Sequence, residues 1–323
     1  MSKPKVLVMK KLPSEVMSYL SDHCEIIIPS SNETDSLQFS ALLGEVEGLI
    51  PAGVRIDNTL LESAPQLKVV SNISVGYDNF DIAAMKARHI IGTHTPYVLD
   101  DTVADLVFGL ILSAARRLPE LDKLVRDGGW VSSVRDEQLF GVDVHHATLG
   151  IIGMGRIGEA IAKRAKFGFD MNVQYSNRSR KADIEERLGV QYAPLDELLA
   201  TSDFVVLMAP HTKETHKMIG KAQFALMKQT AIFINASRGA LVDEEALIEA
   251  LEQKTIYAAG LDVFDQEPVD PANRLLQLSN AVTLPHIGSA TLKTRNDMAM
   301  VAARNLVLAL KGETAPNIVP ELR

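Results

Sequence analysis

Short apolar runs alternate with amphipathic segments along the chain, and this alternation restricts the possible folds more than any other feature. In the first third, the apolar runs span residues 5–9, 24–28, 46–50, 67–71 and 90–92. The segments between them have the apolar spacing of helices. Strands that alternate with helices in this way pair in parallel. We therefore predict an α/β fold built on doubly wound parallel sheets.

The same alternation continues through the middle of the chain, where the helices are longer. The predicted strands are 148–152, 172–175, 204–208, 231–235, 258–261 and 281–284. Two long, largely apolar helices, 102–116 and 291–310, flank this block. We interpret them as the points where the chain crosses between two domains. One domain is then formed by residues 1–99 and 289–323, and the other, residues 100–288, is inserted into it.

Charge and cysteine content narrow the class of protein. The formal net charge is -8 and the pI is about 5.5, which argues against nucleic acid or an acidic membrane surface as the main partner. No run of apolar residues approaches the ~18 needed for a membrane helix. The chain has one cysteine, Cys24, so it has no disulfide of its own. We expect a cytoplasmic protein.

A glycine-rich turn links a predicted strand to a predicted helix in the inserted domain. The segment Gly153-Met-Gly-Arg-Ile-Gly158 follows the strand 148–152 and opens a helix from about 156 to 167. The first glycine permits a tight turn, the second lets the backbone approach a pyrophosphate, and the third lets the helix pack on the strand. A plain strand–turn–helix connection is the alternative, which this context disfavours. We predict two Rossmann-like domains, with the dinucleotide bound by residues 100–288.

The end of the next strand bears on the choice of cofactor. Residues 174–181 read Gln-Tyr-Ser-Asn-Arg-Ser-Arg-Lys, with no carboxylate to hold a ribose 2′-hydroxyl. Arg178, Ser179 and Arg180 could instead bind a 2′-phosphate, because guanidinium and hydroxyl groups are good phosphate donors. We therefore predict NADP as the preferred cofactor over NAD. A solvated basic loop is the alternative.

Three residues suited to hydride-transfer chemistry follow three predicted strands. Arg238, Glu267 and His286 each lie beyond the carboxyl end of a strand, where open α/β sheets bind ligands. His286 can exchange a proton near neutral pH, and Glu267 can orient its imidazole. Arg238 can bind a carboxylate and a developing alkoxide. The three together predict reduction of a 2-keto acid, although each alone could be structural.

These motifs make the chain resemble the D-isomer-specific 2-hydroxyacid dehydrogenases over nearly its whole length. The resemblance is carried by residues 74–80, 153–158, 233–239, 261–268 and 285–290. It implies that Arg238, Glu267 and His286 are catalytic and that the first domain binds substrate. It also implies a homodimer formed largely through the Rossmann domain.

The resemblance extends to individual binding residues. The substrate-binding residues it implies are Val75, Gly76, Arg238, His286 and Ser289. The cofactor-binding residues that we expect are Gly153, Gly155, Arg156, Ile157, Gly158, Asn177, Arg178, Ser179, Arg180, Pro210, Thr215, Ala236, Ser237, Asp262 and Thr102. Ser237 replaces a glycine that is frequent in the family. No metal is expected.

A narrower likeness within the family concerns reductases of small 2-keto acids that prefer NADPH. It is carried by residues 143–146, 167–169 and the basic loop after Asn177. Glyoxylate, hydroxypyruvate and 2-ketogluconate share the same 2-keto acid head, so the sequence does not choose among them. Trp130 lies where related reductases lend a tryptophan to the neighbouring subunit, although dimer packing explains it equally well.

Several residues are not assigned to the site. His145 and His146 lack the ligand spacing of a zinc site, and side by side in a strand they would point to opposite faces. Asp100 and Asp101 are predicted to cap the helix 102–116.

Three other functions stay open. They are a dinucleotide-sensing regulator of dehydrogenase fold, another dehydrogenase of the family acting on phosphoglycerate or formate, and a relative without turnover. The intact set of Arg238, Glu267 and His286 argues against the last of these.

Overall fold

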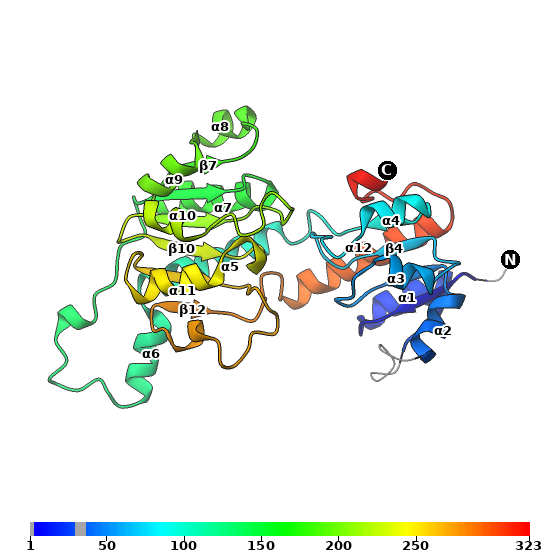
Figure 1. Ribbon diagram of the computed structural model, residues 1–323, viewed down its shortest axis with the longest axis horizontal. Helices are drawn as coiled ribbons and strands as arrows, with labels where there is room; N and C mark the ends of the chain where they lie inside the picture. The colour runs from blue at the N-terminus through cyan, green and yellow to red at the C-terminus, as the bar shows by residue number, and fades with distance from the viewer. Residues whose placement is uncertain (1–2, 30–36) are drawn as a thin grey trace. The chain divides into compact units, whose positions relative to one another are not determined.

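The computed structural model describes residues 3–29 and 37–323 of the chain. The chain forms two compact units (Figure 1). The first unit consists of Met1–Leu99 and Ala290–Arg323, and the second of Asp100–Ser289. The second unit is thus an insertion in the first.

A parallel sheet of five strands, in the order β2-β1-β3-β4-β5, forms the centre of the first unit as far as it is described. Its strands are β1 (Lys5–Val8), β2 (Glu25–Ile27), β3 (Gly48–Ile50), β4 (Val69–Ser71) and β5 (Ile91–Thr93). Its helices are α1 (Ser14–His23), α2 (Leu37–Glu45), α3 (Asn58–Glu62), α4 (Ile82–Ala87) and α12 (Leu292–Leu310). α1 and α12 pack on one face of the sheet, and α2, α3 and α4 pack on the other. Because both faces are covered, the strands are mostly apolar.

A parallel sheet of seven strands, in the order β12-β11-β10-β9-β6-β7-β8, forms the centre of the fully described second unit (Figure 1). Its strands are β6 (Thr148–Ile152), β7 (Asn172–Ser176), β8 (Gln191–Tyr192), β9 (Phe204–Leu207), β10 (Ile232–Asn235), β11 (Ala258–Leu261) and β12 (Ala281–Thr283). Its helices are α5 (Asp100–Ala115), α6 (Leu118–Arg126), α7 (Arg156–Phe169), α8 (Ala182–Leu188), α9 (Leu195–Thr201), α10 (Lys221–Leu226) and α11 (Glu244–Glu252). The predicted fold class, two doubly wound parallel-sheet units, is confirmed.

The order of the strands creates a ligand-binding edge in the second unit. The chain runs outward from β6 through β7 to β8, and then returns to the other side of β6 to form β9, β10, β11 and β12. Sheets of this kind bind ligands beyond the carboxyl ends of the strands, at the point where the direction of winding reverses. That point lies between β6 and β9. No helix in the described residues is long and apolar enough to span a membrane.

One local prediction was wrong in part. Asp100 and Asp101 lie inside the first turn of α5, which begins two residues earlier than predicted, so they are partners of the helix dipole and not caps before the helix. Their carboxylates pair with arginines of α7 at 3.1 Å, Asp100 with Arg156 and Asp101 with Arg164. His145 and His146, which were not assigned to the site, lie in an exposed turn before β6.

Candidate active site

Arg238 lies in a turn that hydrogen bonds hold at the end of β10. The Asn235 side chain accepts a hydrogen bond from the Ser237 N–H (3.1 Å) and donates one to the Arg238 carbonyl (2.9 Å). Ser237 Oγ donates to the Ala209 carbonyl in the loop after β9 (2.6 Å). Ser237 thus ties two loops together at this edge.

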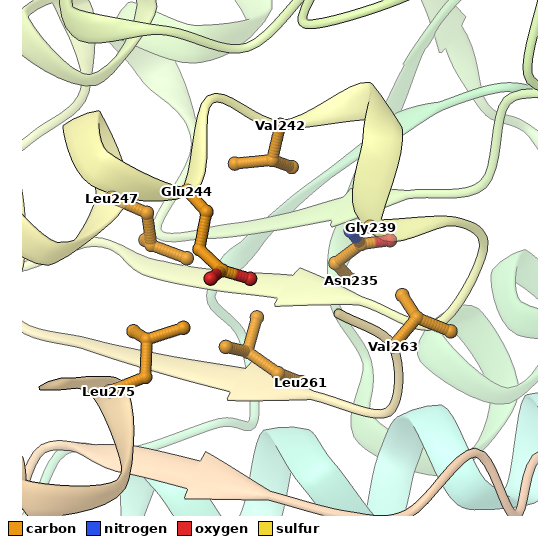
Figure 2. Close-up of a pocket in the computed structure, with 8 residues that line it drawn as sticks. All are labelled: Asn235, Gly239, Val242, Glu244, Leu247, Leu261, Val263 and Leu275. Atoms are coloured by element: carbon orange, nitrogen blue, oxygen red, sulfur yellow. The ribbon is translucent and has the colours of Figure 1, made fainter. Parts of the chain in front are cut away.

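Gly239 brings this turn against the segment that follows β11. A Cβ atom at Gly239 would lie 1.9 Å from the carbonyl carbon and oxygen of Phe264, so no larger residue fits without moving the backbone. Figure 2 shows Gly239 beside Asn235 and Val263 in a small pocket behind the turn. This close approach places the backbone of Arg238 next to the segment that carries Glu267.

Glu267 and His286 form the closest polar contact of the site. His286 Nδ1 lies 2.6 Å from Glu267 Oε2, and the Phe264 N–H donates to Glu267 Oε1 (3.1 Å). Because a carboxylate only accepts, the imidazole carries its proton on Nδ1 and turns Nε2 away from the glutamate. Both side chains keep access to solvent, with His286 48% and Glu267 36% exposed.

The electrostatics of Glu267 favour its charged form. Partial burial opposes ionisation, but the hydrogen bonds from His286 and the Phe264 N–H, together with the charges of His286 and Arg238, outweigh it. The pKa of Glu267 is therefore lowered from its ordinary value. The structure brings together the three residues predicted to be catalytic.

Asp262 fixes the backbone next to His286. The residue is 1% exposed, and its two carboxylate oxygens accept hydrogen bonds from the N–H groups of Ile287 (2.8 Å) and Gly288 (2.7 Å). Burial raises the pKa of Asp262, against the lowering effect of these hydrogen bonds. The His286 N–H donates to the Asp262 carbonyl (2.9 Å). Asp262 thus holds the histidine segment, and its predicted contact with the cofactor stays a prediction.

Glu244, at the start of α11, supports the loop of Glu267 and was not singled out in the sequence. Its carboxylate accepts hydrogen bonds from the Asp265 N–H (3.1 Å) and from the side-chain amide of Asn273 (2.7 Å). Figure 2 shows this side chain directed into the pocket behind Gly239. An acid in the first turn of a helix is ordinarily a partner for the helix dipole, so its sequence position gave no sign of this role.

The glycine loop after β6 has the geometry of a dinucleotide-binding turn. Gly153 adopts a φ of 109°, and a Cβ there would lie 2.6 Å from the Met208 carbonyl. A Cβ at Gly155 would meet nothing within 4 Å, so the space above this residue is open. Asn177, at the end of β7, clamps the loop by accepting from the Met154 N–H (2.7 Å). The N-terminus of α7 therefore faces open space, as a pyrophosphate requires.

The two arginines of the basic loop after β7 differ in their hydrogen bonds. Arg180 donates through Nε (3.0 Å) and Nη2 (2.5 Å) to the Glu185 carboxylate, which also accepts from the Tyr175 hydroxyl (2.7 Å). These hydrogen bonds, first that of Arg180 and then that of Tyr175, lower the pKa of Glu185 to about 2. Arg178 and Ser179 are exposed, and no side-chain hydrogen bond of Arg178 is found within the described residues.

The other predicted cofactor residues lie on loops of the same edge or near it. Thr215 Oγ1 donates to the Pro210 carbonyl (2.8 Å) and accepts from the Thr212 N–H (2.8 Å), which shapes the loop after β9. Ala236 precedes Ser237 in the turn after β10, Ile157 lies in the first turn of α7, and Thr102 lies in the first turn of α5. Ser289 ends the second unit.

Val75 and Gly76 belong to the first unit, in a turn after β4. Ser74 Oγ donates to the Gly76 carbonyl (2.6 Å), and His94 Nδ1 lies 2.8 Å from the Val75 carbonyl. Both residues of the turn are half-buried.

The class of protein follows from this fold and site together with the comparison to known families. Residues 108–288 match the NAD binding domain of the D-isomer specific 2-hydroxyacid dehydrogenases. The chain belongs to this family and is an NAD(P)-dependent dehydrogenase.

Individual relatives match the chain from end to end. It is 48% identical over 318 residues to glyoxylate/hydroxypyruvate reductase B of Escherichia coli O9:H4, a match that covers 98% of each chain. The TT0316 protein of Thermus thermophilus is 42% identical, with a TM-score of 0.90 over 98% of this chain and 99% of that one. An NADPH-dependent glyoxylate/hydroxypyruvate reductase of Sinorhizobium meliloti, solved with NADP and malonate, is 33% identical. Its TM-score is 0.88, over 99% of this chain and 98% of that one.

Proposed function

We propose that the protein reduces glyoxylate and hydroxypyruvate to the corresponding 2-hydroxy acids, with NADPH as the preferred cofactor. The observation that carries this proposal is the Glu267–His286 hydrogen bond of 2.6 Å beside Arg238. Relatives that are 48% identical are glyoxylate/hydroxypyruvate reductases, which supports this substrate class. 2-Ketogluconate carries the same reacting group, and we include it as a third candidate substrate.

In the proposed reaction His286 is the proton donor. A reduced nicotinamide cofactor held at the glycine loop 153–158 would supply the hydride to C2, and the electron pair of the C2=O bond would move onto oxygen. The His286 imidazolium gives its Nε2 proton to that oxygen, so the product is the 2-hydroxy acid. Arg238 binds the substrate carboxylate and stabilises the developing negative charge on oxygen. Glu267 orients the imidazole by accepting a hydrogen bond from Nδ1, which directs Nε2 away from the glutamate.

The proposal that NADPH is the cofactor rests on two loops, one that fits a pyrophosphate and one that fits a ribose 2′-phosphate. Gly155 leaves open space at the N-terminus of α7 for a pyrophosphate. Residues 177–181, at the end of β7, contain no carboxylate to hold a ribose 2′-hydroxyl, and Arg178 is exposed there. A 2′-phosphate would add negative charge next to a guanidinium, so we propose NADPH over NADH.

We propose that the first unit binds the substrate carboxylate and that the protein is a homodimer. The backbone N–H groups of Val75 and Gly76 are the proposed donors of hydrogen bonds to that carboxylate.

The proposed dimer is supported by α6 and the segment after it, because α6 has no buried residue. Exposed apolar side chains gather in this region at Leu118, Val125, Trp130, Val131 and Phe140. Light scattering checks the dimer: a monomer at micromolar concentration contradicts it.

We also propose a cytoplasmic location. The single cysteine, Cys24, is a buried free thiol, which fits this location.

A rate assay tests the proposed function. The initial loss of reduced nicotinamide absorbance is measured with glyoxylate, hydroxypyruvate and 2-ketogluconate, each with NADPH and with NADH. Rapid turnover of glyoxylate or hydroxypyruvate, faster with NADPH at equal concentration, is the expected result. No turnover with any pair, despite tight binding of NADPH, contradicts the proposal and favours a dinucleotide-sensing protein.

A further inference from the structure

The turn after β4 carries two hydrogen bonds that fix its shape. Ser74 Oγ donates to the Gly76 carbonyl (2.6 Å), and the Thr95 N–H donates to the Ser74 carbonyl (2.8 Å). The turn is therefore tied both to itself and to the segment that follows β5. A backbone N–H that binds a carboxylate must be held in direction, because misalignment weakens a hydrogen bond steeply.

His94, one residue beyond β5, holds the peptide bond at the centre of this turn. Its Nδ1 lies 2.8 Å from the Val75 carbonyl oxygen. That oxygen can only accept, so the imidazole carries a proton on Nδ1 and donates it. The Val75 carbonyl and the Gly76 N–H belong to one planar trans peptide unit, in which they point in opposite directions. By holding the carbonyl, His94 fixes the direction of the Gly76 N–H.

His94 is in turn held from three sides within the first unit. Its backbone N–H donates to the Asn317 carbonyl (3.1 Å), and its carbonyl accepts from the Asn305 side chain (3.1 Å). Asn305 lies in α12 with 0% exposure, and Asn317 donates to its side-chain oxygen (3.2 Å). The Tyr77 ring meets the imidazole edge-on at 5.4 Å. The imidazole is thus a fixed support for the turn.

We propose that His94 is a positioning residue for substrate binding, which directs the Gly76 N–H toward the carboxylate of the 2-keto acid. This inference rests on the proposed function, in which that turn binds the carboxylate. His94 acts through the turn, so its loss weakens binding of the acid and leaves cofactor binding as it was. The chemical class recognised is a small carboxylate, for which malonate serves as a non-reacting probe.

Two variants of similar size separate hydrogen bonding from shape. In His94→Asn the amide can donate to the Val75 carbonyl much as Nδ1 does, whereas in His94→Leu no donor remains. We expect the leucine variant to raise the KM for glyoxylate and the Ki for malonate about tenfold, equivalent to ~1.4 kcal/mol. We expect the asparagine variant to stay within about threefold of wild type. The KM for NADPH stays unchanged in both variants. His89→Leu, which changes an exposed histidine of the same unit, is the control.

The outcomes distinguish this inference from the proposed function. Wild-type turnover with an unchanged acid KM in His94→Leu overturns the inference alone, as do equal rises in KM in the two variants. Absence of wild-type turnover overturns the proposed function and the inference with it. If the leucine variant does not fold, His94→Phe decides, because a phenyl ring can keep the edge-on contact with Tyr77 but cannot donate to the Val75 carbonyl. A higher acid KM in His94→Phe supports the inference, and an unchanged KM overturns it.

Discussion

Arg178 and Arg180 are two residues apart, yet the structure predicts that only the first determines the preference for NADPH. Arg178 is exposed, and its charge acts on the exposed Glu214, whose pKa it helps to lower. Its guanidinium is thus available to a 2′-phosphate. Arg180 already gives Nε and Nη2 to Glu185, whose carboxylate would repel a phosphate bound to the same guanidinium. We therefore expect Arg178→Ala to reduce NADPH selectivity much more than Arg180→Ala.

The size of the effect follows from the bond that is lost. A hydrogen bond between charged groups contributes ~1.5–3 kcal/mol, which corresponds to about 10- to 150-fold in a rate ratio. Arg178→Ala should lower the ratio of kcat/KM for NADPH to that for NADH by a factor in this range. Arg180→Ala should lower it by less than about fivefold, because an exposed ion pair with Glu185 already offsets most of its charge.

The assay measures kcat/KM for both cofactors at saturating glyoxylate. Arg187→Ala is the matched control, since Arg187 is an arginine of α8 that pairs with Glu159 at 2.7 Å. The control should leave the cofactor ratio unchanged. Equal losses of selectivity in Arg178→Ala and Arg180→Ala, or no loss in Arg178→Ala, would refute the reasoning from Glu185.

Three further predictions concern the pH dependence of stability at Glu185, the replacement of a tightly packed or an open glycine by alanine, and the loss of His286. The pKa of Glu185 is lowered from 4.5 to about 2, so its stabilising effect is complete above pH 4.5 and is lost as the pH falls toward 2. The difference in Tm between wild type and Glu185→Gln should shrink over that interval, and a constant difference contradicts this. Gly239→Ala should lower the free energy of unfolding in urea by at least ~2 kcal/mol, because its Cβ would overlap the Phe264 carbonyl. Gly155→Ala should leave unfolding nearly unchanged and raise the KM for both cofactors, and unchanged KM values argue against a pyrophosphate there. His286→Ala should lower kcat by about 10²- to 10⁴-fold. Fluorescence titration should then show that NADPH binding survives, and near-normal turnover rules out the proposed proton donor.

The sequence predicted the fold because the relevant pattern is local. Apolar runs and helical spacing are read over a few residues, and both sheets formed where such runs lay. The ends of elements were less accurate where distant residues determine them. α5 begins at Asp100 rather than 102, and the carboxylates of its first turn pair with arginines of α7 more than fifty residues away. No local pattern contains that information.

The residues of the candidate site could be predicted from their types, but the residues that support them could not. Arg238, Glu267 and His286 stand out only as a set, because each follows a strand and together they supply the groups that reduction of a 2-keto acid needs. Glu244 and His94 do not, because an acid in the first turn of a helix and a histidine after a strand are ordinary. What makes them supports is the hydrogen bonds to Asp265, Asn273 and the Val75 carbonyl, which depend on tertiary contacts.

The side chains that support the candidate site share one kind of interaction, a hydrogen bond to the backbone of a loop. Asn235, Glu244 and Asp262 each use a polar side chain to accept hydrogen bonds from backbone N–H groups, in the loops beyond β10, β11 and β12 respectively. A loop held in this way has few alternative conformations, so His286 and Glu267 stay within hydrogen-bond reach of each other. If this reasoning holds, Glu244→Gln should weaken the loop of Glu267 and lower kcat more than it changes the KM for NADPH. Glu249→Gln, on the exposed side of the same helix, is the control. Equal kcat values in the two variants would mean that Glu244 does not support the catalytic loop.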